Sequence, residues 1–496
     1  MYRSRCCCSI ACLLLTPFIG CGQRYVATQS AESSSADAEL NDSITPQSSA
    51  TLLAKIEIPD GTPDELFAYI ASLDEQELSS DAAEQSEMIR ERMAKRVKAC
   101  NAILAQNPAP EAETSAVQLK LDALRTLSIV DPDGIGADFQ TYATSLVNGN
   151  DPYLARLAMA KQFQHTVNNY ISQGTVETST ILEELNTLVA NKEAGPRVFM
   201  EARDAIGWLV PNDEDQLDTD QLTSRMALVA KCYRAIGNGF SNYVDSQVAD
   251  EAKGLLALAD QFDLELLRAR ARTGEAAAVN QLYEKLELMF AAEKKHGNEL
   301  GFAIQTAQGL EFDGLLKPAL RIYELAWKNV ESDHDANLRS HVQRTHERAT
   351  TRLGLVGQPM EISGTANGTA FDWTSYSGKH VLVCFWESWV VGWHDEIKNI
   401  QASVAEHANK PIEIVTVNLD SPELLKEYLD KHQLDITVVS VADSSRSGTE
   451  CSTAIRYGVD MLPFCVLVGP DGNVQRIHVF GAHLIEALQQ LSPASL

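Results

Sequence analysis

Between about residues 51 and 353, apolar side chains recur every three or four positions, the spacing that places them on one face of an α-helix. The clearest stripe runs from Leu315 to Val330. Thr62-Pro63 followed by Glu65 is a typical helix start, and dipeptides such as Asn107-Pro108 and Gly195-Pro196 interrupt the pattern. The stretch therefore predicts about a dozen helices packed as antiparallel hairpins.

A helical repeat array is the alternative to an irregular bundle. The segment from Ala319 to Glu324 resembles part of a tetratricopeptide helix, but the full pattern does not recur at the period of roughly 34 residues that such arrays require. This favours an irregular helical bundle, a kind of domain that more often provides an interaction surface than a catalytic centre.

After Gly357 the pattern changes to short β-rich runs that alternate with helical segments. We predict strands at 380–386, 412–419, 437–441, 464–468 and 474–479, and helices at 392–408, 421–432, 452–457 and 482–491. Gly469-Pro470-Asp471-Gly472 separates the last two strands and is typical of a hairpin. The fold class is thus multidomain, with an all-α domain at 51–353 followed by an α/β domain with a mixed sheet at 354–496.

The charge of the chain excludes one class of function. Its 496 residues include 68 acidic and 41 basic side chains, a formal net charge of −27. From Gly354 onward there are 17 acidic and 8 basic residues, so neither part offers a basic face. Because nucleic-acid binding depends on clustered lysine and arginine, a nucleic-acid partner is excluded.

The N-terminus predicts export and a lipid anchor. Arg3 and Arg5 precede a short apolar run that is typical of a signal peptide (1–20) and too short to span a membrane. Cys21 follows Ile19-Gly20 and resembles the acylated cysteine of bacterial lipoproteins, although Phe18 stands where leucine is usual; an ordinary signal peptide cut elsewhere is the alternative. Residues 21–50 are polar and small and predict a flexible tether. The expected location is the bacterial cell envelope, facing the periplasm or the exterior.

The sequence predicts neither a metal site nor a cofactor. Asp213, Asp215, Asp218 and Asp220 lack the glycine and the glutamate that a calcium loop needs. His334, His341 and His346 are not spaced to place two imidazoles on one helix face. Gly237-Asn238-Gly239 lacks the strand and third glycine of a dinucleotide site.

Several motifs of the C-terminal domain carry a family resemblance. The run from Gly378 to Trp389 is similar to the segment that leads into the active site of TlpA/ResA-like thioredoxin-fold proteins. Phe371-Asp372-Trp373, Tyr457-Gly458-Val459, Leu462-Pro463 and Asp471-Gly472 fit the same family in order and spacing. The resemblance covers about residues 357–491 and implies a thioredoxin-like fold in which Pro463 is the cis-proline that faces the active site.

The active-site motif itself departs from the family. The family has Trp-Cys-x-x-Cys, and alignment on Trp389 puts Val390 and Trp393 where the cysteines belong. Neither side chain can form a covalent bond to sulfur, so the sequence excludes dithiol exchange at this position. Glu396 matches a family carboxylate that assists proton movement, but with no thiol to serve we expect it to be an ordinary acid of the first helical turn.

Five cysteines remain beyond Cys21, at positions 100, 232, 384, 451 and 465. Cys384 and Cys465 lie in predicted strands among apolar residues, which favours structural roles. Cys451 follows the polar stretch 447–450 and is the one candidate for a catalytic thiol, a weak one.

The leading hypothesis is a non-redox binding or scaffold module that holds an unknown envelope protein or peptide. Its groove would be formed by Trp389, Trp393 and Pro463, with both tryptophans partly exposed. The first alternative is a divergent thiol-disulfide oxidoreductase that uses Cys451 with Cys384 or Cys465. A second alternative places the function in the helical domain.

Overall fold

The computed structural model describes residues 49–491 except Thr175, 191–194, 213–214, Gln216, 292–296, 407–411, Gln433, Asp435 and 442–445. The predicted signal peptide, Cys21, all but the end of the tether and Asp213 therefore lie outside the described residues. The chain divides into two compact units between Leu266 and Leu267. No helix in the described part of the chain is both long and apolar enough to span a membrane.

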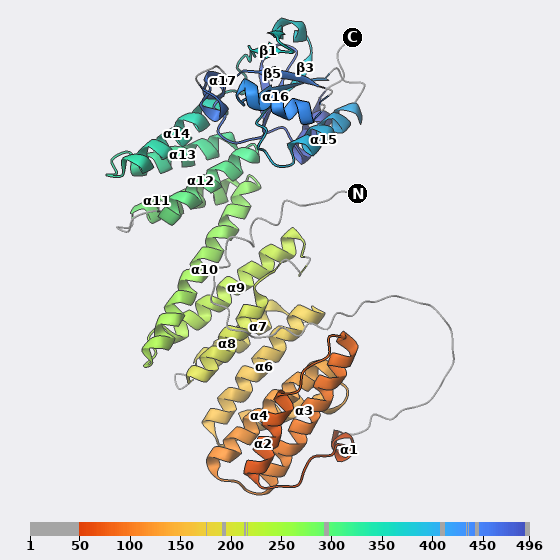
Figure 1. The fold of residues 1–496 in the computed structure, drawn as a ribbon. Coiled ribbons are helices and arrows are strands. Elements are labelled where there is room, and N and C mark those ends of the chain that lie inside the picture. The colour runs from red at the N-terminus through yellow and green to blue at the C-terminus, as the bar shows by residue number, and fades with distance from the viewer. Residues whose placement is uncertain are drawn as a thin grey trace. The chain divides into compact units, whose positions relative to one another are not determined.

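The first unit is helical (Figure 1). Its helices are α1 (Ser49–Ala54), α2 (Pro63–Asp74), α3 (Ala82–Ala105), α4 (Pro110–Val130), α5 (Asp138–Val147), α6 (Pro152–Gln173), α7 (Thr178–Ala190), α8 (Pro196–Leu209), α9 (Thr219–Phe240) and most of α10 (Ser246–Arg272). The predicted start of α2 is confirmed, because Thr62 and Glu65 cap it reciprocally. Helices adjacent in sequence pack together, as α3 does on α4 and α5 on α6.

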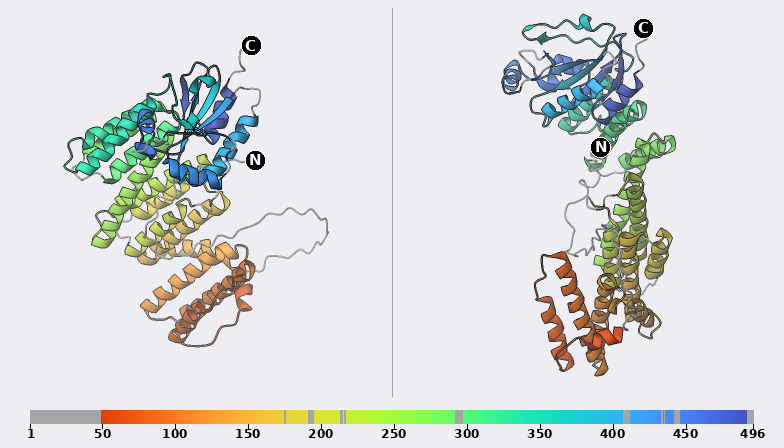
Figure 2. Two further views of the ribbon diagram at one scale, coloured as in Figure 1. Left: turned by 45° about the horizontal axis from the view of Figure 1, so that its top comes forward. Right: turned by 90° about the vertical axis from the view of Figure 1, so that its right-hand side faces the viewer.

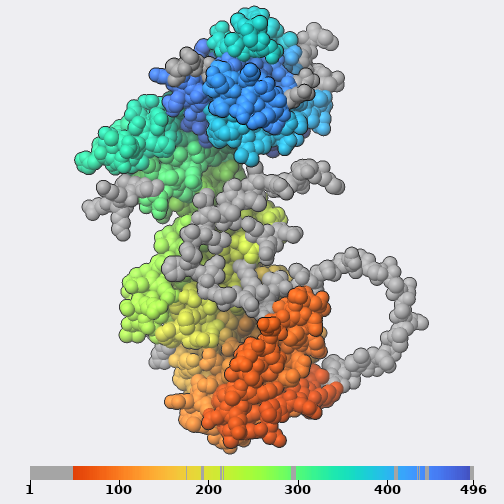
Figure 3. Space-filling view, in the orientation of Figure 1, coloured from red at the N-terminus to blue at the C-terminus, as the bar shows by residue number. Residues whose placement is uncertain are grey.

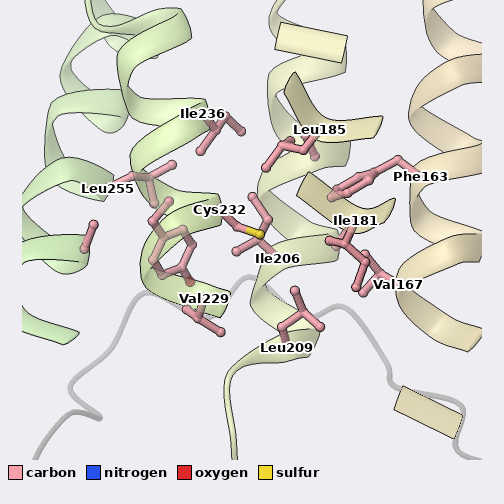
Figure 4. Close-up of a cluster of buried hydrophobic side chains, with 14 of the residues drawn as sticks. Phe163, Val167, Ile181, Leu185, Ile206, Leu209, Val229, Cys232, Ile236 and Leu255 are labelled. Carbon is pink, nitrogen blue, oxygen red and sulfur yellow. The ribbon is translucent and has the colours of Figure 1, made fainter. Parts of the chain in front are cut away.

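One apolar core of this unit lies among α6 to α10 (Figure 4). Phe163 and Val167 of α6 face Ile181 and Leu185 of α7, and the thiol of Cys232 on α9 is buried among them. Burial raises the pKa of the Cys232 thiol to about 12, so this cysteine acts as a small apolar side chain. Two of the aspartates considered as a calcium loop have structural roles: Asp218 caps α9, and Asp215 pairs with Arg225.

The second unit begins with the end of α10 and continues with α11 (Ala276–Ala291), α12 (Gly297–Phe312), α13 (Leu316–Val330) and α14 (Ala336–Leu353). The apolar stripe predicted around Leu315 to Val330 is the buried face of α13. The all-helical region thus extends over 49–353, and the mixed-sheet domain follows it, as predicted. We call residues 354–491 the sheet domain.

The sheet domain contains seven strands in the order β2-β1-β5-β4-β3-β6-β7 among the described residues. The strands are β1 (Thr365–Ala366), β2 (Thr369–Ala370), β3 (His380–Trp386), β4 (Ile412–Asn418), β5 (Thr437–Ser440), β6 (Phe464–Val468) and β7 (Val474–Ile477). β3, β4 and β5 run parallel, whereas β6 is antiparallel to β3 and β7 to β6. Figure 2 shows this sheet from two directions.

Helices α15 (Trp393–Glu406), α16 (Pro422–Lys431) and α18 (Ala482–Gln490) pack on one face of the sheet. Their apolar side chains meet Leu382, Cys384 and Trp386 of β3 and Cys465 and Leu467 of β6 in one cluster. On the opposite face, the ring of Phe385 contacts that of Phe464 and that of Tyr457, which follows α17 (Ser452–Arg456). Both faces of the central strands are therefore buried, which explains their almost continuous apolar sequences.

One edge of the sheet is partly covered, and the other ends in very short strands. Residues 357–360 lie along β7, where Gly357 N–H donates to the carbonyl of Val474 (2.8 Å) and Val474 N–H donates to that of Gln358 (2.9 Å). At the other edge, β1 and β2 are two residues long and are joined by Asn367-Gly368, both with positive φ. The strand predictions did not include this short hairpin, although Asn-Gly is a turn signal.

A buried polar network joins α12 and α14 to the sheet domain. Glu311 of α12 accepts hydrogen bonds from Arg352 of α14 (Nη2, 3.0 Å) and pairs with Nε2 of His478 (2.7 Å), which follows β7. Arg352 also donates to the carbonyl of Gly458 (2.6 Å) and pairs with Asp460. These helices and the sheet domain consequently form one packed body (Figure 3, green and blue).

Candidate functional site

The loop that joins β3 to α15 lies where the resemblance predicts an active site. Val390 N–H donates to the carbonyl of Glu387 (3.1 Å), and Trp393 N–H donates to that of Val390 (3.2 Å). Gly392 has a φ of +79°, a conformation that glycine adopts without strain. These turns carry the chain sharply from the end of β3 into the first turn of α15.

Val390 and Trp393 both pack on the apolar cluster beneath this loop. Trp393, the first residue of α15, is only 2% exposed and stacks on Trp386 with ring centroids 5.6 Å apart. Tyr428 of α16 packs against the indole of Trp386, with ring centroids 5.0 Å apart. Val390 and Trp393, the two positions at which the family resemblance places cysteines, are thus apolar packing positions.

The predicted partial exposure of Trp393 is wrong. Its side chain shares one face of α15 with Ile397 and Ile400, and that face covers the sheet. Trp393 therefore forms part of the floor under the loop and does not line an open groove. The indole N–H groups of Trp386 and Trp393 have no hydrogen-bond partner among the described residues.

Trp389 and Val391 are exposed at the tip of the same loop, with exposed fractions of 67% and 99%. The indole N–H of Trp389 donates to the Glu387 carboxylate, which fixes the side chain beside the loop. Pro463 follows a cis peptide bond, as predicted. Phe385 of β3 pairs with Phe464 of β6, so Pro463, which precedes β6, lies next to Trp386 at the end of β3. Trp389 and Pro463 therefore lie at the same end of β3, and Trp393 lies beneath the loop that carries Trp389.

Two buried carboxylates at this edge were missed by the sequence analysis. Glu387 and Asp420 follow β3 and β4 and are 6% and 4% exposed. Asp420 accepts hydrogen bonds from Ser388 N–H (2.7 Å) and the Asn418 amide (2.8 Å). Burial raises the pKa of Glu387; the bond from Trp389 lowers it, and the charge of Asp420 raises it further. Their positions directly after two buried parallel strands were a signal that could have identified them.

Cys384 and Cys465 are fully buried, as their surroundings predict. They face each other across β3 and β6 in the antiparallel register, and both are free thiols. Burial raises the pKa of Cys465 well above its ordinary value, and contact with Cys384 and the charge of Glu396 add to the increase. The raised pKa keeps the Cys465 thiol protonated, and full burial withholds both sulfurs from a substrate.

Cys451 begins a short helix, as predicted, but it is fully buried. Its sulfur accepts a hydrogen bond from Ala454 N–H at 3.4 Å and so caps α17. A catalytic thiol must reach its substrate, and this one has no exposed surface. Its role in the structure is that of a helix cap.

Comparisons with known proteins relate part of the chain to one family. Residues 357–477 match the AhpC/TSA family. Two proteins named thiol-disulfide oxidoreductase ResA are similar to part of this chain. The protein from Halalkalibacterium halodurans is 23% identical over 127 residues, which is 25% of this chain and 68% of that protein. The protein from Oceanobacillus iheyensis is 26% identical over 133 residues, 27% of this chain and 65% of that protein.

Among solved structures, the thioredoxin domain of a thiol-disulfide oxidoreductase from Bacteroides vulgatus is similar, with 19% identity and a TM-score of 0.24. The match covers 27% of this chain and 96% of that domain. The sheet domain is accordingly an AhpC/TSA-type thioredoxin-like domain, related to thiol-disulfide oxidoreductases of the ResA kind. The matched segments span about two-thirds of the length of the two ResA proteins but only 25% and 27% of this chain.

Proposed function

We propose that the thioredoxin-like domain is a non-redox binding module. The observation that carries the proposal is the burial of Trp393 against Trp386 at the start of α15, with Val390 as its neighbour in the motif. Thiol-disulfide exchange begins with attack by an accessible thiolate. In place of such a thiolate, the site has the apolar side chains of Val390 and Trp393 beneath the loop and the exposed indole of Trp389.

The alternative of a divergent oxidoreductase requires Cys451 together with Cys384 or Cys465. All three are fully buried, and the pKa of Cys465 is raised by that burial. Each would have to leave its packed position before it could react. The binding module requires no such rearrangement, because Trp389 and Val391 are already exposed.

The localisation belongs to the same proposal and rests on the sequence. We propose that Cys21 carries a lipid that holds the protein in the bacterial envelope, with residues 21–50 as a tether. Cys21→Ser should move the protein from the detergent phase to the aqueous phase in a phase-partition experiment. Unchanged partitioning would contradict the anchor and leave the binding module unaffected.

The test of the binding module is reductase turnover with a small aromatic disulfide. We compare the chain that begins after Cys21 with a variant in which Cys384, Cys451 and Cys465 are all serine, and use a ResA protein as the positive control. Absence of turnover in both proteins supports the proposal. Turnover that disappears in the triple variant would overturn it and establish a relocated redox centre.

A further inference from the structure

The most exposed of the large apolar side chains in the sheet domain lie at one end of the sheet. Among its described residues, the three large apolar side chains with the greatest exposed fractions are Val391 (99%), Trp389 (67%) and Leu424 (51%). Val391 and Trp389 lie in the loop before α15, and Leu424 lies in the first turn of α16. Single exposed apolar residues need no explanation, but three at one edge point to an interaction surface.

A hydrogen bond holds these two elements together. Ser388, next to Trp389, donates its N–H to the carboxylate of Asp420 at 2.7 Å, and Ser421 caps the helix that contains Leu424. One turn further along α16, Tyr428 packs on Trp386 beneath the loop. Leu424 lies four residues before Tyr428 and shares its face of α16. The three exposed side chains therefore belong to one surface, which we call the apolar edge.

Acidic side chains outnumber basic ones in the two segments that carry the apolar edge. Residues 387–397 and 418–425 contain five acidic side chains and no lysine or arginine. These acids are Glu387, Asp395, Glu396, Asp420 and Glu423, of which Asp395 and Glu423 are exposed. The nearest basic groups along the chain are Lys398 and Lys426. Across the edge, the segment 446–450 carries Arg446, and Glu450 pairs with Arg344 (3.6 Å).

Resting on the proposed binding function, we propose that the apolar edge binds an extended peptide segment in which large apolar residues alternate with lysine or arginine. The apolar side chains would cover Trp389, Val391 and Leu424, and the basic groups would meet Asp395 and Glu423. Opposite charge at the rim supplies selectivity and speeds association. Three side chains are too small a surface for a folded partner, which needs about 800 Å² on each side.

Other occupants fit the edge less well. Two copies of the chain would bring two acidic rims together, and like charges at an interface oppose association. An anionic membrane surface would be repelled by the same acids, since such surfaces attract basic segments. Both occupants remain outcomes that the experiment distinguishes.

The experiment measures fluorescence anisotropy of a labelled 12-residue peptide of alternating leucine and lysine with the full chain that follows Cys21. Peptides of alternating leucine and glutamate and of alternating serine and lysine are the comparison probes. We expect the leucine–lysine peptide to bind at least tenfold more tightly than either. Affinity should fall at least tenfold in Trp389→Ala and in the Asp395→Lys/Glu423→Lys variant.

Matched controls separate the site from general stickiness. Leu288→Ala removes an equally exposed apolar side chain on α11 (69%), and Glu287→Lys reverses an exposed charge beside it; neither should change the affinity. Val391→Ser removes a fully exposed side chain and tests the edge independently of any effect of Trp389→Ala on folding. Affinity unchanged in Val391→Ser and Trp389→Ala would overturn the proposal.

The remaining outcomes also decide the matter. Equal binding of the leucine–glutamate peptide, or no binding of the leucine–lysine peptide, would refute a basic apolar partner. Binding to zwitterionic vesicles that Trp389→Ala abolishes, without peptide binding, would replace the peptide with a membrane, and dimerisation sensitive to Trp389→Ala would replace it with a second copy. The reductase assay judges the proposed function separately, because these peptides contain no disulfide.

Discussion

The buried network between the helices and the sheet domain allows a quantitative prediction. Arg352→Met removes the guanidinium that hydrogen-bonds Glu311, the carbonyl of Gly458 and Asp460. Arg352 is 1% exposed, as is Glu311, so water cannot replace the lost partner. The methionine fills most of the volume, and the variant mainly tests the charge.

The magnitude follows from the geometry. Removal of one partner from a buried ion pair costs about 3–5 kcal/mol, because the other charge stays buried and uncompensated. Glu311 would keep its bonds from Tyr323 (3.0 Å) and His478 (2.7 Å), which favours the lower end of this range. With an m-value of about 3 kcal/mol per molar urea, the unfolding midpoint should fall by about 1 M.

Tryptophan fluorescence during urea unfolding is a suitable assay, since five of the six tryptophans lie after Leu266 and therefore in the second unit. Arg270→Met is the matched control, because Arg270 forms an exposed ion pair with Glu275 in the same unit, and it should leave the midpoint unchanged. A midpoint in Arg352→Met within about 0.3 M of the unmodified chain, roughly 1 kcal/mol, would refute the argument.

Three further predictions concern protonation, backbone and thiols. Burial alone would raise the pKa of Glu311, but hydrogen bonds from His478 and Arg352 lower it from 4.5 to about 2. About 3 kcal/mol of stability should therefore be lost as the pH falls from 4.5 through 2. Burial raises the pKa of Asp460, and protonation of Asp460 partly offsets this loss. Urea midpoints against pH should show the decline, and Glu311→Gln should flatten it. Gly458→Ala should lower the free energy of unfolding by at least about 2 kcal/mol, because φ is +65° and the added Cβ would lie 2.3 Å from the carbonyl oxygen of Arg348. Gly357→Ala is the control, since Gly357 has a φ of +83° but open space around the added Cβ, and it should cost only about 1 kcal/mol of backbone strain. Urea unfolding measures both variants. Maleimide labelling followed by mass spectrometry should leave the three cysteines of the sheet domain unmodified until the protein is unfolded; rapid labelling of any of them in the native protein would contradict the assigned burial.

Local patterns explain why most elements could be predicted. Residues 380–386 and 464–468 are continuous apolar runs, and both became strands with the predicted bounds. Thr62 and Glu65 identified a helix start from four residues, because capping is a local interaction. β1 and β2 were missed because strands of two residues have no alternating pattern to recognise.

The candidate site was less predictable, because its features depend on packing across the chain. Trp393 was expected at the surface, yet its spacing with Ile397 and Ile400 is that of the buried face of α15. This phase could have been recognised in the sequence. The hydrogen bond between Glu311 and His478 joins residues 167 positions apart, and no local pattern indicates such a pair.

The short and partly covered edges of the sheet have a consequence for how the chain behaves among other proteins. A free edge strand offers unpaired backbone groups to any neighbouring chain, and it is a common starting point for aggregation or for the capture of a foreign strand. Residues 357–360 occupy that position along β7, and the two-residue β2 offers too little backbone at the other edge. Little backbone is thereby left for pairing with other chains, which leaves the side chains of the loops as the main means of selecting a partner.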